Sequence, residues 1–155
     1  MKSKTIVALI LTVIFFIVVD QSIKGIIVQN EVNISLIPGS LEITYVQNSG
    51  MAFGIGNANL PYIIVLNLII IVLIVRFLCN QFEKINNVTK FMLCLILAGG
   101  ISNLVDRIFR GYVVDYINVR LINFPVFNLA DMFIVVGWIM FLLITIRYAI
   151  KNKSA

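Results

Sequence analysis

The sequence has no histidine and only two cysteines, Cys79 and Cys94. A Cys–His nucleophile therefore cannot be assembled, and a zinc site of the usual ligands is not expected. The two cysteines have no metal-like spacing, and we interpret both thiols as small apolar packing residues. We predict neither a metal ion nor another cofactor.

Charged residues are scarce as well. They make up 12% of the 155 residues, whereas 61% are hydrophobic and the mean hydropathy is +1.04. A soluble domain of this length has about 25% charged and about 45–50% apolar residues. The composition therefore indicates an integral membrane protein in one domain, residues 1–155, which we expect to be monomeric. So little charge argues against nucleic acid as a partner, although the net charge is +5.

Four apolar stretches are long enough to cross a bilayer, since a helix of about 20 residues spans roughly 30 Å of hydrocarbon. They cover approximately residues 5–28, 61–78, 90–109 and 128–148. The first also resembles a secretory signal, because Lys2 and Lys4 precede its apolar core. No small-x-small cleavage site follows, so we predict a retained membrane anchor.

Lysine and arginine are absent from the first connection, about residues 29–60. They occur instead before the first helix, around the second connection and after the fourth helix: Lys2, Lys4, Arg76, Lys84, Lys90, Arg147, Lys151 and Lys153. Because cytoplasmic loops carry the excess of basic residues, we place both termini and the 79–89 loop in the cytoplasm. The third connection, about 110–127, is then outside, although Arg110 and Arg120 make it fit the rule less well.

The first connection has the pattern of a β-strand. In "SLEITYVQNSG", Leu41, Ile43 and Tyr45 alternate with polar residues, and turn signals lie on both sides. We predict a two- or three-stranded extracytoplasmic sheet within residues 31–57, lying on the membrane surface. The third connection is too apolar for a solvated loop, and we expect an outer loop packed near the helix ends. The expected fold is thus mainly α, a bundle of four transmembrane helices with a small sheet.

Four of the seven acidic residues are expected near the outer side of the membrane: Asp20, Asp106, Asp115 and Asp131. The first two come late in helices that run outward, and the last comes early in the returning helix. Charges inside a membrane are costly and usually face a bundle interior or a wet cavity. The four acids are therefore candidates for a functional site.

Sequence neighbours separate these acids into two kinds. Lys24 follows Asp20 at i+4, so this pair could be either a structural ion pair or a catalytic element. Arg107 and Arg110 follow Asp106, which we interpret as a scaffold or substrate-positioning residue. Asp115 and Asp131 have no cation within four positions. They could be capping or loop-anchoring groups, with Asn128 as a helix N-cap. They could also form a site in which two close carboxylates share a proton and act as general base and general acid in peptide hydrolysis.

Four segments resemble the lipoprotein signal peptidase family (signal peptidase II). They are "DQSIKGII" at 20–27, "YVQNSGMAFGI" at 45–55, "GGISNLVDRIFRGYVVDYI" at 99–117 and "FNLADMFIVVG" at 127–137. The segments occur in the family's order, and the resemblance covers nearly the whole chain. The third and fourth segments are the most specific.

The resemblance implies an aspartic endopeptidase of the bacterial inner membrane, with its active site near the extracytoplasmic leaflet. Such enzymes cut the signal peptide from diacylglyceryl-modified prolipoproteins, just before the lipidated cysteine, among membrane lipids. They are blocked by globomycin-type cyclic peptides. The family's catalytic pair falls on Asp115 and Asp131. Further motif positions that line or support the pocket fall on Asp20, Lys24, Asn48, Gly99, Asn103, Asp106, Arg107, Asn128 and Ala130.

Three other interpretations stay open at this point. The acids could be the relay of a small proton-coupled transporter or channel subunit. A Ser–Lys pair, Ser49 or Ser102 with Lys24, could replace the carboxylates as the catalytic group. The acids could also serve a metal-dependent enzyme.

The glycines within residues 50–56 would let this outer segment bend over a substrate.

Overall fold

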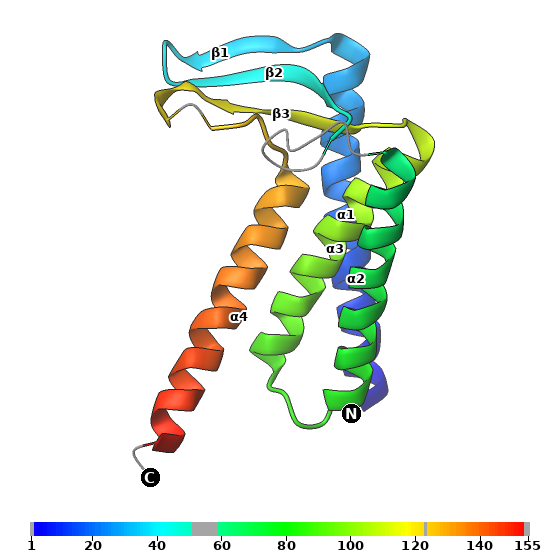
Figure 1. Cartoon of the computed structure of the whole chain (residues 1–155), viewed down its shortest axis with the longest axis vertical. Helices are drawn as coiled ribbons and strands as arrows, with labels where there is room; N and C mark the ends of the chain where they lie inside the picture. The colour runs from blue at the N-terminus through cyan, green and yellow to red at the C-terminus, as the bar shows by residue number, and fades with distance from the viewer. Residues whose placement is uncertain (1, 51–58, 123, 154–155) are drawn as a thin grey trace.

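The computed structural model describes residues 2–50, 59–122 and 124–153. Within these residues four long helices run side by side, and the ends of α1 and α4 that carry the two termini lie at the same end of the bundle (Figure 1). A small sheet crosses the opposite end. The helices are α1 (Lys2–Asn30), α2 (Leu60–Gln81), α3 (Asn87–Phe109) and α4 (Leu129–Lys153). Most of the glycine-containing segment that we expected to bend lies outside the described residues.

All four helices are long and apolar enough to cross a membrane. Their ends extend past the apolar runs of the sequence, for example to Asn30 in α1 and Lys153 in α4. Apolar runs mark the part of a helix that fits hydrocarbon, whereas backbone hydrogen bonds continue into polar residues. The expected bundle of four membrane-type helices is confirmed.

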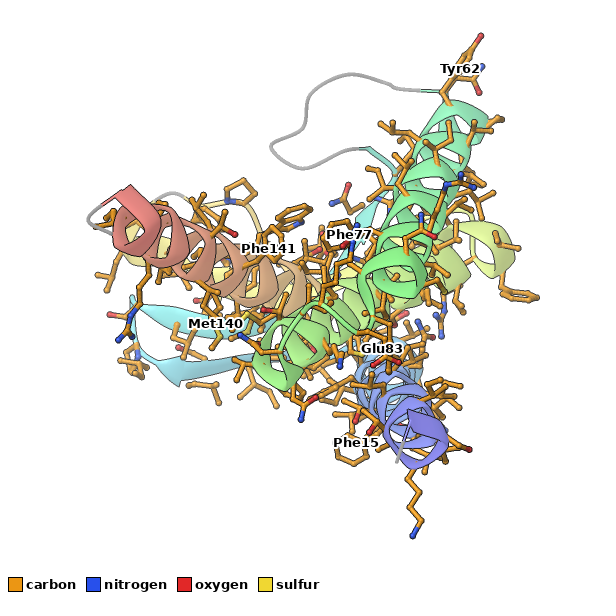
Figure 2. All side chains as sticks on the ribbon, turned by 90° about the horizontal axis from the view of Figure 1, so that it is seen from below. Phe15, Tyr62, Phe77, Glu83, Met140 and Phe141 are labelled. Atoms are coloured by element: carbon orange, nitrogen blue, oxygen red, sulfur yellow. The ribbon has the colours of Figure 1, made fainter. Side chains whose placement is uncertain are left out.

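Helix α3 is the centre of the bundle. In its most apolar stretch 72% of residues are buried, against 6–11% in the other three helices. It packs against α1, α2 and α4, whose outer faces expose large apolar side chains such as Phe15. Figure 2 shows these carbon-rich side chains pointing away from the bundle axis. The exposed apolar surface is therefore what a bilayer would cover.

Small residues set the distance between α3 and α4. A Cβ added to Gly99 would lie 2.2 Å from the backbone oxygen of Ala130. A Cβ added to Gly137 would lie 2.6 Å from the Cγ1 of Ile96. The two helices can approach this closely only because hydrogen replaces a side chain at both points, as is common in membrane bundles.

The sheet has three antiparallel strands in the order β1 (Asn33–Ile37), β2 (Leu41–Asn48) and β3 (Val113–Val119). The predicted small sheet is confirmed, with β1 and β2 inside residues 31–57; β3 lies in the connection between α3 and α4, where we expected an outer loop. Residues 113–116 are all buried, so they show no alternation of polar and apolar positions. Their partners in β2 are also distant in sequence, with Asn48 opposite Val113. A short 3-10 helix, η2 (Arg120–Ile122), follows.

Candidate active site

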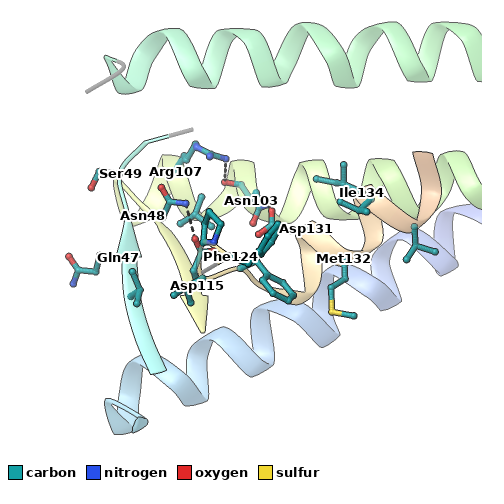
Figure 3. A pocket seen from close by; sticks show the side chains of 17 residues that line it. Gln47, Asn48, Ser49, Asn103, Arg107, Asp115, Phe124, Asp131, Met132 and Ile134 are labelled. Carbon is teal, nitrogen blue, oxygen red and sulfur yellow. Dashed lines mark hydrogen bonds between the residues drawn. The ribbon is translucent and has the colours of Figure 1, made fainter. Parts of the chain in front are cut away.

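A pocket of about 770 Å³ lies where the sheet meets the ends of α3 and α4. Asp115 from β3 and Asp131 from α4 both line it, as Figure 3 shows. Asn48, Asn103 and Arg107 supply most of its other polar groups. The rest of the wall is mainly apolar, including Val113, Phe124, Pro125, Val126, Phe127, Met132, Ile134, Val135 and Val136.

Asp131 is held by the start of its own helix. Its backbone N–H donates to Asn128 Oδ1 at 2.9 Å, and its Oδ2 accepts the backbone N–H of Asn128 at 3.1 Å. This reciprocal pair is a capping box, which uses two N–H groups that a helix leaves without partners. Asn128 is therefore the N-cap of α4. The helix dipole also favours negative charge at this position.

Asp115 is almost fully buried, with 2% of its surface exposed. Its Oδ2 accepts from Asn48 Nδ2 at 2.8 Å and its Oδ1 accepts from Asn128 Nδ2 at 2.6 Å. Burial raises the pKa of Asp115 from 3.8 to about 6, and the charge of Asp131 adds to this rise. The hydrogen bonds from Asn48 and Asn128 act in the opposite direction. The single side chain of Asn128 thus contacts the backbone of one acid and the carboxylate of the other.

Behind the pocket lies a cluster with no exposed surface, formed by Asp20, Lys24 and Asp106 and called the buried triad below. Lys24 Nζ lies 2.8 Å from Asp20 Oδ2 and 2.8 Å from Asp106 Oδ2. It also donates to Asn103 Oδ1 at 2.8 Å. Asn103 Nδ2 in turn donates to Asp131 Oδ1 at 2.8 Å. The side-chain amide of Asn103 therefore lies between Lys24 of the triad and Asp131 of the pocket.

The remaining residues predicted from sequence lie around these groups. Arg107 reaches the backbone oxygens of Asn103 and Gly50, both at 3.4 Å. Gly99 and Ala130 are the contact point of α3 with the first turn of α4, and Ala130 is fully buried. All eleven residues named from the motifs thus occupy one end of the bundle.

Sequence reasoning missed Gln21, a polar residue in contact with this region. Its Nε2 donates to Ser102 Oγ at 3.0 Å and to Asp106 Oδ1 at 3.1 Å. Its Oε1 accepts from Arg110 Nη1 at 3.0 Å, and the same Arg110 atom pairs with Asp106 Oδ1. An amide side chain next to Asp20 in an apolar run was the signal that could have revealed this role. The residues of the apolar wall carry no such signal.

The contacts of Lys24 do not favour a Ser–Lys mechanism. An ammonium group has three N–H donors, and Lys24 directs them at two carboxylates and an amide oxygen. Ser102 Oγ donates to Asp20 Oδ2 at 2.6 Å. Ser49 lines the pocket, where the basic side chain is that of Arg107. In the described residues, no group of three or more His, Cys, Asp or Glu is placed to hold a metal.

Two carboxylates that face one largely apolar pocket can activate water without a covalent intermediate. Together with the membrane-type helices, this arrangement is the one expected of a membrane protein of the aspartic peptidase class. A family model described as "Signal peptidase (SPase) II" matches residues 12–147. The chain therefore belongs to the signal peptidase II family, the lipoprotein signal peptidases.

Individual relatives agree with this assignment. A lipoprotein signal peptidase of Streptococcus pneumoniae is 36% identical over 157 residues, which are 99% of this chain and 100% of that protein. One of Caldicellulosiruptor bescii is 46% identical over 105 residues, which are 67% of this chain and 66% of that protein. A solved structure titled as a bacterial membrane enzyme at 2.3 Å resolution has a TM-score of 0.81 and 29% identity. The match covers 94% of this chain and 91% of that one. The chain is thus a multi-pass bacterial membrane enzyme.

Proposed function

We propose that the chain removes signal peptides from diacylglyceryl-modified prolipoproteins by cutting before the lipidated cysteine. The observation that carries this proposal is the pair formed by Asp115 and Asp131, which line one pocket and are joined through Asn128. Family membership supports the substrate, because the relatives are lipoprotein signal peptidases. The pocket supports the reaction type.

Hydrolysis needs one carboxylate ionised and one protonated. The ionised member accepts a proton from water as the oxygen attacks the scissile carbonyl, and the protonated member donates to the carbonyl oxygen. The tetrahedral intermediate then collapses, the amine takes a proton and leaves, and a new carboxyl end remains. No covalent enzyme intermediate forms. Two carboxylates in one partly dry pocket favour this singly protonated state, since both cannot ionise easily.

A lipid-modified substrate fits the surroundings of the pocket. The apolar wall includes Phe124, Phe127 and Met132, and it continues along α4, whose outer face is exposed and apolar. The acyl chains can stay in the bilayer while the peptide bond reaches the carboxylates. We place the sheet on the extracytoplasmic side, with both termini in the cytoplasm, from the distribution of basic residues. Globomycin-type cyclic peptides are expected to compete for the same pocket.

A gel-shift cleavage assay on a diacylglyceryl-modified prolipoprotein tests this function. We expect cleavage by the wild type, no cleavage of the unlipidated precursor and no effect of chelators, because the chemistry uses only carboxylates. Loss of activity with a chelator would contradict the mechanism and favour a metal-dependent enzyme. Proton flux in liposomes without any cleavage would instead support a transporter.

The pH dependence of cleavage should have an alkaline limb governed by Asp115. Burial raises the pKa of this carboxyl to about 6, so its proton is present below that value and is lost as the pH rises through it. Because the reaction needs one proton on the pair, kcat/KM should decline by about tenfold per pH unit above this pKa.

We expect Asn48→Ala to move the alkaline limb to higher pH, because it removes a hydrogen bond to the ionised form of Asp115. Profiles of kcat/KM from about pH 5 to 9 would measure the alkaline limb of the wild type and its shift in Asn48→Ala. A wild-type kcat/KM that stays flat or rises in the alkaline range would contradict the assignment.

A further inference from the structure

The buried triad (Asp20, Lys24 and Asp106) touches the protein backbone at two points that matter for catalysis. Asp20 Oδ1 accepts the backbone N–H of Ala130 at 3.0 Å. Asp106 Oδ2 accepts the backbone N–H of Val114 at 3.2 Å. Ala130 is the residue before Asp131, and Val114 is the residue before Asp115. Each triad carboxylate therefore holds the backbone N–H of the residue that precedes one member of the carboxylate pair.

Lys24 joins these two anchors. Its Nζ lies 2.8 Å from an oxygen of each carboxylate, so a single atom links the amide of Ala130 to the amide of Val114. Its third hydrogen bond goes to Asn103 Oδ1, whose amide donates to Asp131 Oδ1. We propose that the buried triad is a positioning device, which fixes the backbones carrying Asp115 and Asp131 at one mutual distance and orientation. This inference rests on the proposed catalytic role of that pair.

Stability alone does not explain such a cluster. Replacing a buried ion pair by apolar groups of similar volume is often neutral or stabilising. Apolar groups could fill the space of Asp20 and Lys24 between α1 and α3, but they could not accept the N–H of Ala130 or Val114. Those two N–H groups belong to different elements, the first turn of α4 and the second residue of β3. Through these hydrogen bonds the triad connects the start of α4 to the start of β3, which apolar side chains could not do.

Position matters here because both carboxylates must meet one water molecule and one carbonyl. A displacement of about 1 Å in a catalytic group can reduce a rate by about a hundredfold. The expected signature is a fall in kcat with little change in KM, since the pocket wall that binds the substrate is left in place.

Two charge-balanced double variants separate positioning from stability. Lys24→Met/Asp20→Asn removes the ion pair but keeps an oxygen for the N–H of Ala130. Lys24→Met/Asp20→Leu removes the same charges and the oxygen. We expect the first, which keeps the oxygen but loses the link through Lys24, to lose about tenfold in kcat and the second to lose about a hundredfold, with KM changed less than about threefold in both. Equal kcat values for the two would overturn the proposal.

A second measurement does not depend on folding of the leucine variant. Replacing Ala130 by its α-hydroxy analogue turns the Leu129–Ala130 amide into an ester, which deletes the N–H that Asp20 accepts and weakens the Leu129 carbonyl as an acceptor. The N–H of a second helical residue has no intrahelical partner, so no hydrogen bond donated within the helix is lost. We expect kcat to fall by about tenfold or more at similar KM. An unchanged kcat would also overturn the proposal.

The control is an ion pair of the sheet, Arg120 with Glu42 at 2.7 Å. Arg120→Met/Glu42→Gln removes an equal amount of charge outside the triad and should leave kcat unchanged; a comparable loss there would count against a role specific to the triad. Asp131→Asn belongs in the same assay. If Asp131→Asn stays active, the proposed function fails whatever the double variants do. If it is inactive and the double variants are alike, only the positioning role fails.

Discussion

Asp131→Asn and Asp115→Asn should each reduce prolipoprotein cleavage by about 10³-fold or more while the protein stays folded. An amide cannot accept a proton from water, and it cannot pass a proton to the substrate as a carboxylic acid does. Folding should survive Asp131→Asn because the amide oxygen of the new side chain can still accept the N–H of Asn128, as Asp131 Oδ2 does at 3.1 Å. The double variant should be hardly slower than either single one, because the two groups act as a unit.

Initial rates in the gel-shift assay measure this effect, and thermal unfolding in detergent reports whether the fold persists. The matched control is Glu42→Gln, which also replaces a carboxylate by an amide but lies on the sheet and pairs with Arg120. Its rate should equal that of wild type. Near-normal turnover by either aspartate variant would rule out catalysis by the carboxylate pair.

Gly99→Ala should both destabilise the protein and remove most of its activity. The added methyl would lie 2.2 Å from the backbone oxygen of Ala130 and 2.7 Å from Ile134 Cγ1. A backbone oxygen in the first turn of α4 cannot move without moving the helix. Overpacking of this kind costs about 1–3 kcal/mol, sometimes more. A shift of α4 would also displace Asp131, and a shift of about 1 Å can reduce the rate about a hundredfold.

Gly100 is the control, since it is the next residue of the same helix. A Cβ there would lie 3.6 Å from Asn67 Oδ1, which is an ordinary contact. Gly100→Ala should therefore keep full activity, and it should be slightly more stable because alanine is the better helix former. The melting temperatures and cleavage rates of the two variants test the prediction. If Gly99→Ala melts and cleaves like Gly100→Ala, the spacing of α3 and α4 does not depend on this contact.

The sequence was sufficient to predict the four helices and to single out the four acids near one end of the bundle. Apolar runs report membrane crossing directly, because hydrocarbon tolerates little else over that length. Acids in such runs are costly enough that their positions stand out, as Asp20 and Asp131 do. The N-cap of α4 could also be predicted, because Asn128 directly precedes the apolar run of the fourth helix.

Relations between distant residues could not be read from one sequence. Strand β3 is buried throughout its first half, so its composition resembles that of an apolar loop. The link from Asn128 to Asp115 depends on how β3 lies beside α4. The anchoring of Ala130 by Asp20 joins residues 110 positions apart. Local patterns carry no information about such contacts, which arise only when α3 brings its neighbours together.

The double use of Asn128 has a consequence for how activity appears during synthesis. A chain translated only as far as β3 contains Asp115 but neither Asp131 nor the amide that links the two acids. The side chain of Asn128 that caps α4 also bonds the Asp115 carboxylate, so the start of the helix and the assembly of the proposed catalytic pair coincide. We therefore expect no hydrolysis by the growing chain until α4 has formed against α3.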